Sequence, residues 1–137
     1  MKLVIDASIA AALLIDLAYS ETAREAVSNA ESALAPDLIT YEIANTFWKI
    51  ANAGQAEVSQ LQDALAYLPI LLDELVSPQA LAAEAFELSM KLNHPAYDCF
   101  YLALAKRADA TLITADRRLA KLLQTNQTGI PIKYAGS

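Results

Sequence analysis

Short apolar runs alternate along this chain with longer segments of helical period, and this alternation constrains the fold more than any other feature. Four runs have the length and residue types of β-strands: 3–5 (LVI), 32–36 (SALAP), 109–116 (DATLITAD) and 129–134 (GIPIKY). Strands separated by helices favour a parallel sheet with helices on both faces, so the sequence predicts a doubly wound α/β fold.

The segments between these runs have the spacing and end signals of helices. Helices are expected over residues 20–30, 36–54, 59–68, 77–92, 95–108 and 116–123. Ser20 is expected to cap the first of them, and Ser77 followed by Pro78 begins the fourth. The run 70–76 (ILLDELV) fits either a strand or a helix end, and we expect a strand. GIPIKY is expected at a sheet edge because Pro131 cannot donate to a ladder.

Length and composition restrict the class of protein. A chain of 137 residues suits a single domain, so we expect residues 1–137 to form one. The content of 55% hydrophobic and 19% charged residues excludes a disordered chain. Cys99 is the one cysteine, so it forms no internal disulfide and is expected in the core. The longest charge-free stretch near the N-terminus, residues 7–15, is too short for a membrane span, and we expect a cytoplasmic protein.

The net charge of −6 opposes extensive nucleic-acid binding, because phosphate contacts need cations. Half of the ten lysines and arginines nevertheless fall within sixteen residues: Lys106, Arg107, Arg117, Arg118 and Lys121. A local basic patch and an ordinary solvated helix face explain this cluster equally well.

Four acidic residues fall where a doubly wound sheet places its ligands, beyond the carboxyl ends of the strands. Asp6 ends the first strand and Asp116 ends the ATLIT strand. Asp98 lies near the start of the helix before that strand. Glu42 lies in the first turns of the helix after Pro36. Each has a structural alternative: Asp6 and Asp116 can cap helices, Asp98 can favour a helix dipole, and Glu42 can be solvated.

Taken together, the four carboxylates favour a cation site. Two carboxylates about 4 Å apart repel by about 4 kcal/mol at an effective dielectric of 20. A cluster of four is therefore tolerated only if some protonate or a cation binds. Oxygen ligands prefer hard divalent ions, Mg²⁺ or Mn²⁺, which can activate water against a phosphodiester.

Several motifs give the chain a family resemblance. IDAS (5–8), PDLITYEIANTFWK (36–49) and HPAYDCFYLALAKRADATLITAD (94–116), with acids in the order Asp, Glu, Asp, Asp, resemble the PIN-domain ribonucleases. The resemblance is to the VapC toxins of VapBC toxin–antitoxin systems and spans essentially the whole chain. It implies a PIN-like α/β domain with a central parallel sheet of 4–5 short strands and helices on both faces.

The resemblance also implies the chemistry. Asp6, Glu42, Asp98 and Asp116 are then the acidic quartet that binds one or two Mg²⁺ or Mn²⁺ ions. Supporting or water-mediated contacts come from Ser8, Asn45 and Thr114. The basic cluster noted above supplies the candidate RNA contacts, Arg117, Arg118 and Lys106. The implied activity is endonucleolytic cleavage of RNA by metal-activated water. The implied partners are RNA, a second copy in a homodimer and a cognate VapB-type antitoxin.

Two other functions remain open. A PIN-like domain can be a non-catalytic RNA- or protein-binding module that keeps its acids for stability. A receiver-like phosphotransfer domain also displays aspartates at a sheet edge, but it would require a lysine at a strand end, and neither ATLITAD nor ILLDELV supplies one.

The number of metal ions stays open. Several PIN relatives carry a further acid shortly after the last aspartate of the motif, where this chain has Arg117 and Arg118.

Overall fold

The computed structural model describes residues 1–136, which form five β-strands and seven α-helices. The strands are β1 (Lys2–Ile5), β2 (Ser32–Pro36), β3 (Glu74–Val76), β4 (Thr111–Thr114) and β5 (Ile132–Tyr134). The helices are α1 (Ala7–Leu14), α2 (Ser20–Val27), α3 (Leu38–Asn52), α4 (Val58–Leu71), α5 (Pro78–Leu92), α6 (Ala96–Ala108) and α7 (Arg117–Asn126).

The five strands form one parallel sheet in the order β3-β2-β1-β4-β5, which confirms the predicted α/β architecture. β1 is central and pairs with β2 on one side and with β4 on the other, where Leu3 lies opposite Thr111. From β1 the chain proceeds toward one edge of the sheet, and from β4 it proceeds toward the other. The break between β1 and β4 is therefore the switch point where such sheets bind ligands.

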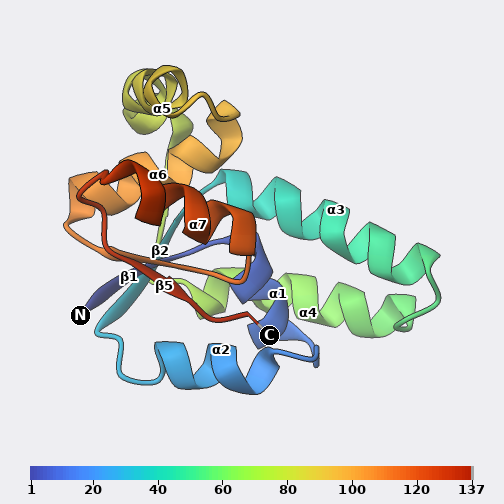
Figure 1. Cartoon of the computed structure of the whole chain (residues 1–137). Helices are drawn as coiled ribbons and strands as arrows, with labels where there is room; N and C mark the ends of the chain where they lie inside the picture. The colour runs from blue at the N-terminus through green and yellow to red at the C-terminus, as the bar shows by residue number, and fades with distance from the viewer. Residues whose placement is uncertain (137) are drawn as a thin grey trace.

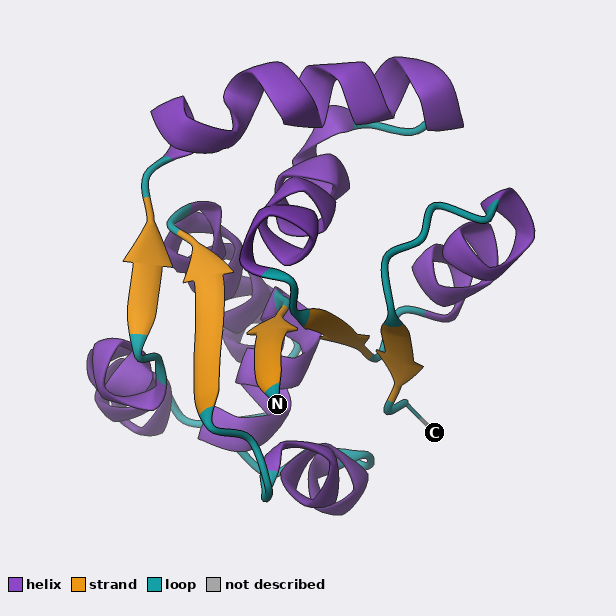
Figure 2. Ribbon diagram, turned by 90° about the vertical axis from the view of Figure 1, so that its left-hand side faces the viewer, coloured by secondary structure: helices purple, strands orange, loops and turns teal. Residues whose placement is uncertain are grey.

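Helices cover both faces of this sheet (Figures 1 and 2). In Figure 1, α5, α6 and α7 lie on one side of the strands, and α1, α2 and α4 lie on the other. The helix α6 packs on the three central strands, and α5 packs on α6. The helices α3 and α4 extend side by side away from the sheet (Figure 1). The carboxyl ends of β1 and β4 thus meet between helices of both layers.

Burial on both faces explains why the central strands are continuous apolar runs rather than alternating ones. Leu3, Val4 and Ile5 of β1 are almost completely buried, as are Leu112 and Ile113 of β4. Cys99 lies in the same core, as expected for an apolar cysteine. Within residues 1–136, no helix combines the length and the hydrophobicity needed to cross a bilayer.

Most predicted elements are present, but the strand predicted over residues 70–76 is only partly correct. Ile70 and Leu71 end α4, and only Glu74–Val76 forms a strand. A short apolar run does not by itself distinguish a strand from a helix end. Leu61 and Leu68 of α4 already face the core, so the helical period carries through Pro69 to Leu71. β5 lies at the sheet edge directly after Pro131, as predicted.

The predicted cap at Ser20 is wrong. Ser20 is the first residue within α2, and Tyr19 occupies the cap position. The buried Ser20 hydroxyl instead accepts from the Leu17 N–H at 2.8 Å and donates to the Ile15 carbonyl at 3.1 Å. Its role is to close the turn between α1 and α2, which sequence position alone did not reveal.

The Ser20 contacts predict a stability cost for Ser20→Ala. Removing the hydroxyl leaves two backbone groups of this tight turn without a partner, so we expect a loss of about 1–3 kcal/mol in the free energy of unfolding. Urea denaturation measures it. Ser28→Ala is the matched control, because the exposed Ser28 hydroxyl contacts only the Glu25 carbonyl at the end of α2, and it should change stability by no more than about 0.5 kcal/mol. Equal effects of the two substitutions would contradict this role.

Candidate functional site

Asp6 connects the ends of the two central strands. It follows β1 and caps α1, and its Oδ1 accepts hydrogen bonds from the Ser8 hydroxyl at 2.5 Å and the Ile9 N–H at 3.1 Å. Its Oδ2 accepts a hydrogen bond from the hydroxyl of Thr114, the last residue of β4. The side chain is 8% exposed. The capping role is thus present, and it holds the carboxylate at the switch point.

The environment of Asp6 opposes its negative charge. Burial raises the pKa of this carboxyl from 3.8 to about 6, although the bonds from Ser8, Thr114 and Ile9 lower it. The charge of Asp98 contributes a further increase. Protein donors therefore offset only part of the cost of a buried carboxylate.

Glu42 lies in the second turn of α3 and is half-buried. Its Oε1 accepts a hydrogen bond at 2.5 Å from the hydroxyl of Tyr101 on α6, 59 residues away. The pKa of Glu42 is raised, first by burial and then by the charges of Asp98 and Asp6, while the Tyr101 bond lowers it. Burial and the charge of Glu42 raise the pKa of Tyr101 above its ordinary value, so its hydroxyl keeps its proton.

Asp98 lies in the first turn of α6. Its Oδ2 lies 2.6 Å from Nε2 of His94, which stands four residues earlier, just before the helix. Asp98 contributes to the raised pKa of both Asp6 and Glu42. The structure therefore brings three of the four predicted acids into one electrostatically coupled group.

Asp116 is arranged differently. Its Oδ1 accepts from the Arg118 N–H at 2.9 Å and the Leu119 N–H at 3.3 Å, so it caps α7, and the side chain is exposed. The backbone N–H of Asp116 donates to Thr114 Oγ1 at 2.9 Å. Thr114 donates in turn to Asp6, so a single residue bridges Asp116 and Asp6. In the chain from Met1 to Gly136, no three His, Cys, Asp or Glu side chains form a group ready to hold a metal ion.

Two of the three supporting residues predicted from the sequence touch this group. Thr114 donates to Asp6, and the Ser8 hydroxyl both donates to Asp6 and accepts from the Ala115 N–H at 2.9 Å. These hydroxyls tie the β4 end to the β1 end. Asn45 is exposed on α3, three residues after Glu42.

The predicted cations lie in two places. Arg117 and Arg118 are exposed at the start of α7, directly after Asp116, and the Arg117 guanidinium lies 5.7 Å from the centre of the Tyr134 ring. Lys106 lies in the last turn of α6, where it pairs with Glu84 of α5 at 3.2 Å. The two arginines therefore border the acidic group, whereas Lys106 lies two turns along α6 from Asp98.

The donor chemistry of the site fits a hard divalent cation. Its donors are carboxylate and hydroxyl oxygens, which Mg²⁺ and Mn²⁺ prefer. The pKa values of Asp6 and Glu42 are raised first by burial and then by neighbouring carboxylates, so the protein's own donors offset only part of the cost of these charges. A cation would relieve that repulsion.

Two contacts in this site were not predicted from the sequence. Tyr101 and Glu42 are 59 residues apart on different helices, so no local sequence spacing indicates their hydrogen bond. The His94–Asp98 contact has an i, i+4 spacing, which is a usable signal for neighbours on a helix.

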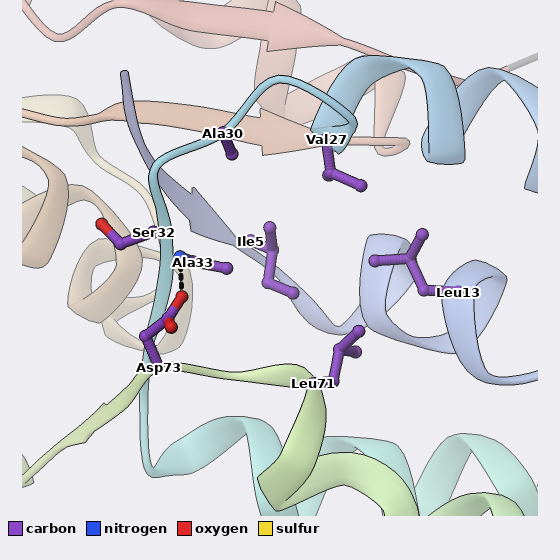
Figure 3. A pocket seen from close by; sticks show the side chains of 8 residues that line it. All are labelled: Ile5, Leu13, Val27, Ala30, Ser32, Ala33, Leu71 and Asp73. Carbon is purple, nitrogen blue, oxygen red and sulfur yellow. Dashed lines mark hydrogen bonds between the residues drawn. The ribbon is translucent and has the colours of Figure 1, made fainter.

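A cavity of about 140 Å³ lies elsewhere, between β1, α1, α2 and the end of α4. Figure 3 shows mainly apolar side chains around it, including Ile5, Leu13 and Leu71. Its acidic residue, Asp73, accepts a hydrogen bond at 2.7 Å from the Ala33 N–H. None of the predicted site residues lines this cavity, so it is not the candidate site.

Comparisons with known proteins bear on the family and the fold of the chain. The family model described as "PIN domain" matches residues 3–122. The chain is 38% identical over 123 residues to "Ribonuclease VapC3" of Pyrobaculum aerophilum, covering 88% of this chain and 94% of the relative. It is 30% identical over 97 residues to "Ribonuclease VapC1" of Mycobacterium tuberculosis, covering 71% and 68%.

Two solved structures have the same fold. PAE2754 from Pyrobaculum aerophilum superposes with a TM-score of 0.71 at 23% identity, over 96% of this chain and 89% of that one. VapBC2 from Rickettsia felis, solved bound to a DNA fragment from its promoter, gives a TM-score of 0.67 at 13% identity, over 98% of both chains.

The raised pKa of Asp6 predicts how the metal-free protein responds to pH. A carboxyl that binds its proton more tightly when folded stabilises the fold below its unfolded pKa, and that contribution is lost as the pH rises through the folded value. In EDTA, as the pH rises from 4 to 6.5, the free energy of unfolding of wild type should fall by up to about 3 kcal/mol relative to that of Asp6→Asn. Urea denaturation across this range measures the difference. A difference that stays constant with pH would contradict the raised pKa.

Proposed function

The chain belongs to the PIN-domain family, and we propose that it is a metal-dependent endoribonuclease, the toxin of a type II toxin–antitoxin system. The observation that carries the proposal is the coupled group of Asp6, Glu42 and Asp98 at the switch point of the sheet. The names of the VapC3 and VapC1 relatives support ribonuclease activity. We further propose that residues 1–137 are one PIN domain that acts in the cytoplasm.

In this proposal the acidic quartet holds one or two Mg²⁺ or Mn²⁺ ions. Asp6, Glu42 and Asp98 supply carboxylate oxygens from three different elements. Asp116 joins them from the adjacent strand end, and both of its capping bonds go to Oδ1. A divalent ion bound there supplies a Lewis acid that activates water and offsets the charge of a phosphodiester. Ser8 and Thr114 keep Asp6 in place, and Asn45 contacts water or substrate at the rim.

RNA would approach along the side of α7. Arg117 and Arg118 are exposed beside Asp116 and are proposed to contact phosphates. Lys106 would contact RNA only beyond the site, because it lies at the far end of α6 and pairs with Glu84. With a net charge of −6, the protein must concentrate its phosphate contacts in such a patch.

We propose two protein partners. A VapB-type antitoxin is supported by the Rickettsia felis neighbour, which is a VapBC assembly. An apolar cavity of about 290 Å³ between α3 and α4 offers it a surface, lined by Phe47, Trp48, Leu61 and Leu65 among others. A second copy of the chain is supported by Phe86 and Met90, which are one turn apart on α5 and largely exposed.

A non-catalytic PIN-like module that binds RNA or protein is the second candidate. One specific observation favours it, namely that Asp6 and Asp116 both cap helices and so have a structural role. Capping does not explain Glu42 or Asp98, because neither caps a helix in residues 1–136. A cleavage assay separates the two functions.

The nuclease proposal predicts that the acids are required for cleavage. Antitoxin-free protein should cleave structured RNA with Mn²⁺, and Asp98→Asn or Asp116→Asn should slow cleavage by about 100-fold or more, since loss of even a supporting residue at a metal site costs about 10–100-fold. Asp63→Asn is the control, because Asp63 is an exposed acid on α4, outside the acidic group. Cleavage by Asp98→Asn at the wild-type rate would count against the proposal. Binding of RNA without any cleavage by wild type would favour the module.

The antitoxin surface predicts a fluorescence change. Trp48 is the one tryptophan of the chain and is 60% exposed, so its emission reports on the α3–α4 cavity. Adding the protein encoded by the adjacent reading frame should shift this emission to shorter wavelength as the indole is desolvated. Trp48→Ala should weaken the complex in a pull-down, whereas Tyr67→Ala, an exposed aromatic residue of α4 outside the cavity lining, should not. If the complex forms and Trp48 emission does not change, the antitoxin binds another surface.

A further inference from the structure

Tyr101 is a fully buried tyrosine whose hydroxyl points at a proposed metal ligand. The side chain is 1% exposed and lies one helical turn after Asp98 on α6. The hydroxyl donates to Glu42 Oε1 at 2.5 Å, which is a short bond to a carboxylate. It thereby joins the helix that carries Asp98 to the helix that carries Glu42.

The hydroxyl is not explained by packing. The ring fills core space that a phenylalanine ring would also fill, and burying an additional hydroxyl costs free energy unless it finds a partner. The partner here is a carboxylate from another helix, α3, not a nearby backbone group. The contact therefore constrains Glu42 at least as much as it satisfies Tyr101.

Hydrogen bonds to the other three acids follow a common pattern. Asp98 contacts His94 through Oδ2, and Asp116 accepts its two capping bonds through Oδ1. Asp6 is held on both oxygens by its own turn and by Thr114. Each of these three acids thus has a hydrogen-bond partner within four residues in sequence, and Asp6 has Thr114 of β4 in addition. Glu42, which has the longest side chain, is instead held from a distant helix by Tyr101.

We propose that Tyr101 is a positioning residue, whose buried hydroxyl holds Oε1 of Glu42 and leaves Oε2 to bind the divalent cation. This inference rests on the proposed metal site. A glutamate on a helix loses several side-chain rotations when it binds an ion, and a side chain already fixed before binding avoids that loss. Second-layer hydrogen bonds of this kind typically change metal affinity by about 10–100-fold.

Tyr101→Phe tests the proposal because it keeps the ring and removes only the hydroxyl. Calorimetric titration with Mn²⁺ should show affinity about 10–100-fold weaker than wild type. Tyr97→Phe, an exposed tyrosine on the same helix beside Asp98, should bind Mn²⁺ as wild type does. Saturating Mn²⁺ should restore RNA cleavage by Tyr101→Phe but not by Asp98→Asn. Mn²⁺ affinity equal to that of wild type in a folded Tyr101→Phe protein would overturn the inference.

A double-mutant cycle separates positioning from a general effect on the fold. If Tyr101 acts through Glu42, the hydroxyl should have little effect on Mn²⁺ affinity once Glu42→Gln has removed the charged ligand. If Tyr101→Phe weakens Mn²⁺ affinity equally in wild type and in Glu42→Gln, the hydroxyl does not act through Glu42. That result would overturn the proposal. Should Tyr101→Phe fail to fold, Tyr101→Met is a smaller replacement that adapts its shape to the core and has no hydroxyl, and it should show the same weakening.

The proposed function and this inference fail in different ways. If wild type binds no Mn²⁺ and cleaves no RNA, the metal-dependent nuclease is wrong and the positioning role falls with it. If wild type binds Mn²⁺, and Asp6→Asn and Asp98→Asn abolish binding while Tyr101→Phe does not weaken it, the metal site stands and the role of Tyr101 is wrong.

Discussion

Holding a buried carboxylate at the end of the central strand of a parallel sheet is the constraint on which this site depends. The chain places Asp6 where β1 ends and then surrounds it with donors from its own turn and from Thr114 of β4. These bonds reduce the cost of burial without removing it, as the raised pKa of Asp6 indicates. Further carboxylates on α3 and α6 increase the repulsion. The fold thus maintains a local excess of negative charge that it does not neutralise.

The acids of the site are also structural residues of the fold. Asp6 begins α1, Asp116 begins α7, and the Ser8 and Thr114 hydroxyls link the two strand ends. A substitution at Asp6 or Asp116 therefore changes helix capping as well as charge. Glu42 and Asp98 have no capping role, so their substitutions separate chemistry from folding more clearly.

The sequence was sufficient to predict the sheet and the strand ends, because buried parallel strands appear as short apolar runs and polar residues mark where they stop. It did not distinguish a helix end from a strand at Ile70 and Leu71, since local hydrophobicity is the same in both. Ser20 was misassigned because its partners depend on how the α1–α2 turn closes. The Tyr101–Glu42 bond depends on two helices meeting across the fold, which no local pattern encodes.

The central position of β1 also determines when the sheet and the site can assemble during synthesis. β1 leaves the ribosome well before its partner β4, which is made more than a hundred residues later. The bond between Asp6 and Thr114 spans the same interval. During synthesis the acidic group therefore cannot assemble around Asp6 until β4 has been made. An enzyme that attacks RNA would in this way remain inactive beside the messenger from which it is being read.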